Sequence, residues 1–144
     1  MLKLKLKILV LICIFFAPGL TVAGDFDGSE PFLCAVIEAI ECLPGEGCNK
    51  GTPESINLPR FFKINVKEKK ITTTRESSRR EATTIERLEH IDGKLIIEGV
   101  QDGLEKVRDG LGWTMAINEE SGEMVLTAAG DQVGFVVFGA CTIP

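Results

Sequence analysis

The chain has 144 residues and carries 16 Lys and Arg against 21 Asp and Glu, a formal net charge of −5 at pH 7. This length predicts one domain, since domains usually span about 100–200 residues. The acidic balance excludes a general nucleic-acid-binding surface, and a charged content of 26% excludes a wholly disordered chain. The single His excludes mechanisms that need several imidazoles.

The first 23 residues have the composition of a secretory signal peptide. Three lysines precede an apolar stretch from Ile8 to Leu20, and small residues around Ala23 offer a cleavage position. The stretch is shorter than the roughly 20 residues that a membrane-spanning helix needs, so no span is expected, and an uncleaved anchor is the alternative. Cleavage leaves one exported domain, residues 24–144, with a net charge of −8 and a periplasmic or extracellular location.

A helix is predicted between Ser29 and Leu43. Its start has a capping Ser and an early Pro, Pro-Gly follows its end, and four apolar residues recur at helical spacing: Leu33, Val36, Ile37 and Ile40. This helix is expected to pack against the β-rich remainder of the domain.

The four cysteines of the exported domain predict two disulfides, because an even number is typical of exported chains. Zinc is the competing interpretation, but the C-x2-C pairs of zinc sites are absent, so no metal and no cofactor are expected. On the predicted helix, Cys34 and Cys42 lie about 12 Å apart, too far for a disulfide. Of the two pairings that remain, we expect Cys42–Cys48, closing the Pro-Gly loop, with Cys34–Cys141 between the helix and the C-terminal strand. The alternative joins Cys34 to Cys48 and Cys42 to Cys141.

Beyond Cys48 the periodicity is that of β-strands. Turns are predicted at Lys67–Lys70, Asp92-Gly93, Glu119–Gly122 and Gly130-Asp131. About seven strands result, in residues 61–66, 71–74, 85–91, 94–97, 113–118, 123–128 and 134–139. The last is apolar on both faces, which predicts burial on both sides. The expected fold is mainly β, an antiparallel meander forming either a small barrel or a curled sheet.

No recognisable catalytic arrangement occurs. His90 is interpreted as a solvent-facing turn residue, because no second His or free Cys accompanies it. Glu38 and Glu41 lie one turn apart on the predicted helix, and a carboxylate-dependent hydrolase is therefore an alternative function. The segment Asn118–Glu123 lacks the residue order of a calcium loop. We expect that the protein is not an enzyme.

Residues 60–80 contain eight basic and two acidic residues, a net charge of +6 within an otherwise acidic chain. Such a segment can dock on an anionic partner, such as an envelope component or an acidic protein. The alternative is that its lysines protect an edge hairpin from strand pairing. The candidate binding residues are Arg60, Lys63, Lys67, Lys69, Lys70, Arg75, Arg79 and Arg80.

These features favour a non-catalytic binding or inhibitor-like protein that binds no nucleic acid. An inhibitor would use an exposed loop, for which Gly99–Gly112 is the candidate. A further alternative is a barrel that binds a small apolar ligand in an interior lined by Trp113 and phenylalanines.

Overall fold

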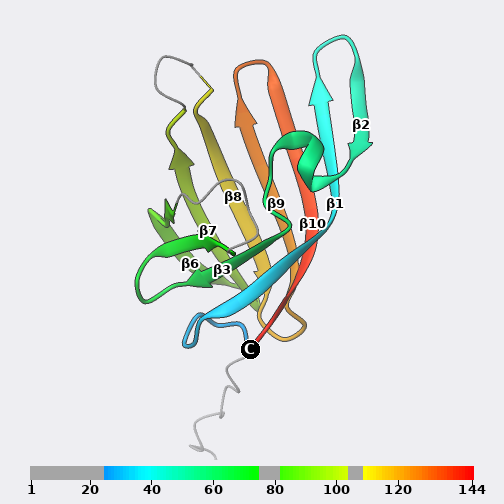
Figure 1. The fold of residues 1–144 in the computed structure, drawn as a ribbon. Coiled ribbons are helices and arrows are strands. Elements are labelled where there is room, and N and C mark those ends of the chain that lie inside the picture. The colour runs from blue at the N-terminus through cyan, green and yellow to red at the C-terminus, as the bar shows by residue number, and fades with distance from the viewer. Residues whose placement is uncertain (1–24, 75–81, 104–108) are drawn as a thin grey trace, which may run out of the picture.

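The computed structural model describes residues 25–74, 82–103 and 109–144. In these residues the chain forms one antiparallel sheet of ten strands, ordered β5-β4-β3-β1-β10-β9-β8-β7-β6, with β2 paired to β1 outside this path (Figure 1). The predicted signal peptide lies outside the described residues. The elements are β1 (Phe32–Leu43), β2 (Gly47–Gly51), the short 3-10 helix η1 (Pro53–Ile56), β3 (Phe61–Asn65), β4 (Lys70–Thr73), β5 (Thr83–Thr84), β6 (Arg87–Ile91), β7 (Lys94–Gln101), β8 (Leu111–Asn118), β9 (Glu123–Gly130) and β10 (Val133–Thr142).

The sheet is strongly curled. Strands β6 to β10 form a meander of successive hairpins, β10 pairs with β1, and β1 pairs with β3. One segment, residues 83–91, bonds to strands from both ends of this path. The Ile85 N–H donates to the Lys69 carbonyl beside β4, and the Glu86 N–H donates to the Glu98 carbonyl of β7, each at 2.9 Å. The curl therefore brings the two ends of the sheet to one segment.

The predicted N-terminal helix is wrong, because residues Phe32–Leu43 form strand β1. A β-bulge between Val36 and Glu38 explains the misleading spacing. Phe32, Cys34 and Val36 are buried with the period of two that a strand requires, but the extra residue moves the next buried position to Ala39. The resulting three-residue step resembles helical spacing. Among the described residues the one helix is η1, and no helix there has the length and apolarity of a membrane span.

The prediction of a mainly β, antiparallel fold is confirmed, but the sheet has ten strands among the described residues rather than the expected seven or so. Each expected strand has a counterpart from β3 to β10, and the structure adds β1, β2 and the two-residue β5. The Asp92-Gly93 turn is present, with φ values of 50° and 69°. The expected burial of the last strand on both faces is wrong, since Phe138 of β10 is 40% exposed.

Both expected disulfides, Cys34–Cys141 and Cys42–Cys48, are present. Each joins residues that face one another across paired strands, β1 with β10 and β1 with β2, and their Cα atoms lie 3.9 and 4.0 Å apart. No helix separates Cys34 from Cys42, because both lie on strand β1, yet the expected pairing is correct. On an extended strand, Cys34 and Cys42 are separated by about 26 Å, which excludes that pair even more firmly.

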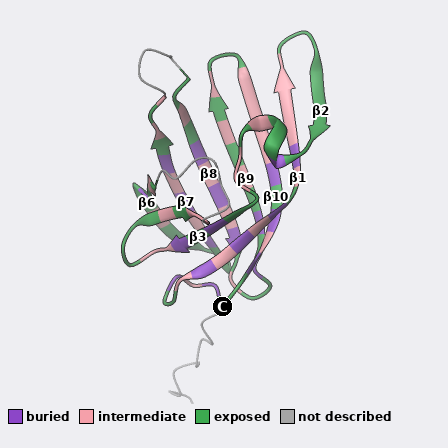
Figure 2. Cartoon of the chain, viewed as in Figure 1, coloured by how far each residue is buried: buried purple, intermediate pink, exposed green. Residues whose placement is uncertain are grey.

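The buried residues form one core cluster, which the inner face of the curled sheet encloses. Figure 2 shows where these residues lie along the strands. At the end nearest the C-terminus this face is filled by large apolar residues, among them Phe32, Ile64, Leu95, Ile117 and Met124. The segment before β1 covers this end. Its Phe26 packs edge-on against Phe32, with ring centroids 5.8 Å apart, and its N–H donates to the Glu119 carbonyl at 3.0 Å.

Two hairpins close in the same way. In the β3–β4 turn, Asn65 Oδ1 accepts the Glu68 N–H at 3.1 Å. In the β8–β9 turn, Asn118 Oδ1 accepts the N–H groups of Glu120 and Ser121, each at 2.9 Å. Asn is suited to this position because its short side chain can accept hydrogen bonds from the backbone two or three residues further on.

Candidate functional site

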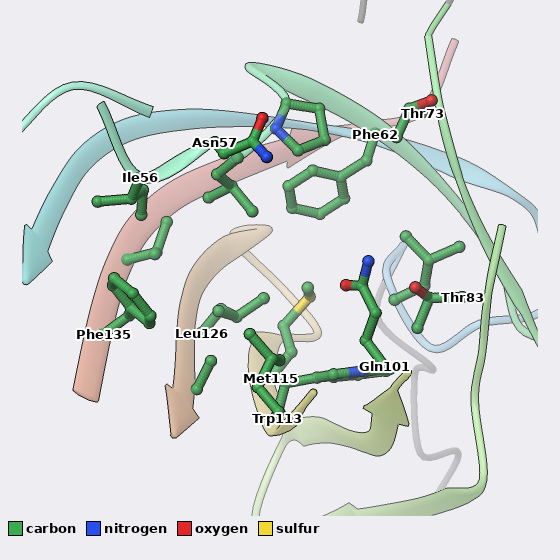
Figure 3. A pocket seen from close by; sticks show the side chains of 16 residues that line it. Ile56, Asn57, Phe62, Thr73, Thr83, Gln101, Trp113, Met115, Leu126 and Phe135 are labelled. Carbon is green, nitrogen blue, oxygen red and sulfur yellow. The ribbon is translucent and has the colours of Figure 1, made fainter. Parts of the chain in front are cut away.

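An apolar pocket lies inside the curled sheet, at the end opposite the packed core. Its volume is about 140 Å³, and it is partly open to solvent (Figure 3). Phe62 of β3, Trp113 and Met115 of β8, Leu126 of β9 and Val137 of β10 supply much of its wall, and the η1 segment contributes Ile56 and Leu58. The inner face is thus closely packed at one end and hollow at the other.

The alternation of the strands creates this wall. Trp113, Met115 and Ile117 of β8 are buried, whereas the residues between them are partly exposed. On β9 and β10, Leu126 and Val137 line the pocket, but their neighbours Val125 and Phe138 are exposed. Trp113, expected from the sequence to line an interior, does line the pocket.

A few polar side chains interrupt the apolar wall. Thr83 and Gln101 line the pocket, and neither side chain makes a hydrogen bond to the described residues. Gln101, at the end of β7, projects its amide into the pocket beside Trp113 (Figure 3). Trp113 is 7% exposed, and its indole Nε1 has no hydrogen-bond partner within the described part of the chain. No Asp, Glu, Lys, Arg or His occurs among the described lining residues.

The Trp113 ring lies over Gly99, its direct partner on β7. A Cβ atom at residue 99 would come within 2.5 Å of the indole Cζ2 and within 2.6 Å of the Thr84 carbonyl oxygen. Glycine is therefore required for the ring to rest on the strand at this point. The spacing of Gly99 and Trp113 in the sequence contains no signal of this contact, because the two residues meet only through the register of β7 and β8.

The structure describes five of the eight basic residues from the predicted docking segment. Arg75, Arg79 and Arg80 lie outside the described residues. Arg60 binds Glu54 at 2.7 Å, and Lys67 lies 3.6 Å from Glu30. The remaining lysines, Lys63, Lys69 and Lys70, are on the β3–β4 hairpin and form no ion pair with the described residues.

The Arg60–Glu54 pair fastens η1 to the start of β3. Glu54 Oε1 accepts hydrogen bonds from both Nε and Nη2 of Arg60. These side-chain hydrogen bonds hold the pKa of the Glu54 carboxyl below its usual value. Both groups are well exposed, so the pair orients the segment beside the pocket without contributing much stability.

The carboxylates considered for hydrolysis do not share a face. Glu38 is opposite the exposed Phe138, whereas Glu41 is opposite Phe135, which lines the pocket. Because residues three apart on a regular strand point to opposite faces, these two side chains diverge. Glu38 instead binds Lys50 at 2.8 Å. The prediction that both carboxylates lie on one helical face is therefore wrong, because these residues belong to strand β1.

His90 is half exposed, as expected, but it belongs to strand β6 rather than to the turn, and its side chain has a partner. Its Nδ1 lies 2.5 Å from Glu119 Oε1. This contact joins β6 to the β8–β9 turn near the covered end of the sheet.

The Asn118–Glu123 segment forms the β8–β9 turn, in which Asn118 Oδ1 accepts backbone hydrogen bonds. The described residues contain no group of three or more potential metal ligands.

The candidate loop Gly99–Gly112 is only partly a loop. Its first residues belong to β7 and its last two to β8, while residues 104–108 lie outside the described residues. The outer face of the sheet carries an exposed apolar group that the sequence did not predict. Val125 and Phe138 are paired across β9 and β10 and are 39% and 40% exposed. Ile37, in the neighbouring bulge of β1, is 72% exposed.

Comparisons with protein-family models, with curated proteins and with solved structures find no match to this chain.

Proposed function

We propose that this protein is a non-catalytic binding protein that holds a small apolar ligand inside its curled sheet. The pocket beside Trp113 carries the proposal. Its volume of about 140 Å³ is close to the roughly 150 Å³ of an engineered apolar cavity that takes up benzene. Ligand sites are typically concave and mostly apolar, with a few polar groups that orient the ligand.

The strand order supports a ligand-enclosing role. If residues 83–91 count as one bent strand, eight antiparallel strands follow one another around the sheet, in the sequence β1, β3, β4, β5–β6, β7, β8, β9 and β10. Eight-stranded up-and-down barrels have interiors that are just wide enough for side chains or for one small ligand. We infer that this sheet is such a barrel, filled at one end and hollow at the other.

Filling the pocket tests this function. Ala128 faces Trp113 on β8 and Phe135 on β10, so Ala128→Phe would place a ring in the pocket. We expect cyclohexane to change the fluorescence of Trp113, the only tryptophan of the chain, in the unmodified protein. In Ala128→Phe the affinity should fall at least about tenfold, because the occupied space excludes the ligand.

The matched control is Ala129→Phe, one residue further along β9, on the exposed outer face. It adds the same side chain without entering the pocket, so it should bind cyclohexane as the unmodified protein does. Equal loss of binding in both variants, or no binding by the unmodified protein, would contradict the proposal.

A second candidate function concerns the basic hairpin. The β3–β4 lysines without ion pairs to the described residues favour docking on an anionic partner such as a lipid surface or an acidic protein. Reversal of Lys63, Lys69 and Lys70 to Glu should abolish salt-sensitive binding to anionic vesicles. Equal binding by the reversed variant would remove this candidate.

The proposed role belongs to an exported protein. Two disulfides are typical of an oxidising compartment, in keeping with the predicted signal peptide and a periplasmic or extracellular location.

A further inference from the structure

The geometry points to a specific class of ligand for this pocket: a small, uncharged molecule with an apolar body and one oxygen that meets the amide of Gln101. This inference rests on the proposed binding function and adds the polarity and orientation of the ligand.

The size of the body follows from the volume. Since benzene occupies a cavity of roughly 150 Å³, a pocket of about 140 Å³ holds a body of about six non-hydrogen atoms. Apolar residues from five strands, β3, β4, β8, β9 and β10, and from the η1 segment surround this space with aliphatic, aromatic and thioether groups. A single ring or a short branched chain fits such a wall better than a long acyl chain.

The position of the polar group follows from Gln101 and Trp113. These residues are diagonal neighbours across β7 and β8, and they lie next to one another at one edge of the pocket (Figure 3). The Gln101 amide has both donor and acceptor capacity but no partner among the described residues. This unpaired amide favours a hydroxyl or carbonyl oxygen on the ligand, which can accept a hydrogen bond from its NH₂ group.

The described wall of the pocket carries no charged side chain, and this composition disfavours charged ligands. A carboxylate or ammonium group would lose its hydration there without an oppositely charged partner among the described lining residues. A neutral oxygen has a smaller desolvation cost, which one or two hydrogen bonds offset. The pocket is therefore expected to distinguish neutral ligands from charged ligands of the same shape.

Three probes with one ring separate these contributions: cyclohexane, cyclohexanol and cyclohexanecarboxylate. None absorbs where tryptophan is excited, so Trp113 reports binding of each. In the unmodified protein, cyclohexanol should bind at least about tenfold more tightly than the carboxylate. Gln101→Met keeps a side chain of similar length but removes the amide. This substitution should lower the affinity for cyclohexanol, relative to that for cyclohexane, about fivefold.

The outcomes are distinguishable. If neither cyclohexane nor cyclohexanol binds the unmodified protein, the proposed function fails, and this inference fails with it. If both bind, but Gln101→Met leaves their affinity ratio unchanged, only the assignment to Gln101 is overturned. Binding of the carboxylate as tight as that of cyclohexanol would overturn the preference for neutral ligands. Binding of cyclohexane by Gln101→Met shows that the variant is folded. The comparison of cyclohexanol with the carboxylate uses the unmodified protein and needs no variant.

Discussion

Replacement of both Cys34 and Cys141 by alanine is expected to lower the free energy of unfolding by about 4–5 kcal/mol. The two residues are 107 positions apart, so their disulfide constrains nearly the whole unfolded domain. In the chain-entropy model, the stabilisation by a disulfide increases with the logarithm of the number of residues in the loop that it closes. Cys34 is also fully buried, so its loss removes contacts from the core. Urea unfolding followed by circular dichroism measures the change.

The matched control is the other disulfide. Cys42 and Cys48 are six positions apart, and the same model gives their bond about 2 kcal/mol. Replacement of this pair by alanine should therefore cost roughly half as much. The Cys34/Cys141 variant should also show a larger dependence of the free energy on urea, because its unfolded chain is less compact. Equal destabilisation by the two double replacements would contradict the loop-closure explanation.

Gly99→Ala is expected to lower the free energy of unfolding by about 1–3 kcal/mol and to change the environment of Trp113. The added methyl group has no free space, because the indole ring lies on one side and the Thr84 carbonyl oxygen on the other. The ring must move, and the wall of the pocket moves with it. Urea unfolding should show the destabilisation, and a shifted Trp113 emission maximum with weaker cyclohexane binding should accompany it.

Gly112 supplies the control for this substitution. It lies on β8 directly before Trp113, but a Cβ atom there meets nothing within 4 Å. Gly112→Ala should therefore change the stability by less than about 0.5 kcal/mol and leave the emission of Trp113 unaltered. If Gly99→Ala were equally neutral, the ring would not rest on residue 99, and the described shape of the pocket would be wrong.

Local patterns were sufficient to predict the hairpins. Two examples are the Asp92-Gly93 turn and the alternation of Trp113, Met115 and Ile117. Both patterns depend only on residues that are close in the sequence, so they can be recognised in a single sequence. Strand β1 was mistaken for a helix because its bulge is imposed by pairing with β10, about a hundred residues away. Tertiary pairing overrides local spacing in such cases.

The site was only partly predictable for the same reason. Trp113 was recognised as a potential wall residue, but Gln101 and Gly99 became significant only through the register of β7 and β8. Glu38 and Glu41 were expected on one face of a helix, but these residues belong to a strand, so their side chains diverge. The charge segregation of residues 60–80 was visible in the sequence, yet the partners of Arg60 and Lys67 were set by the fold.

The most direct measurement of the central claim is the set of intermolecular nuclear Overhauser effects between cyclohexanol and the protein. The measurement can distinguish the pocket from the outer face of the sheet, because neighbouring residues on β9 and β10 lie on opposite faces. Leu126 and Val137 line the pocket, whereas Val125 and Phe138 are exposed outside. A ligand held inside the sheet should show contacts to Leu126, Val137 and the indole protons of Trp113. Contacts confined to Val125 and Phe138 would place the ligand on the outer face and contradict the account.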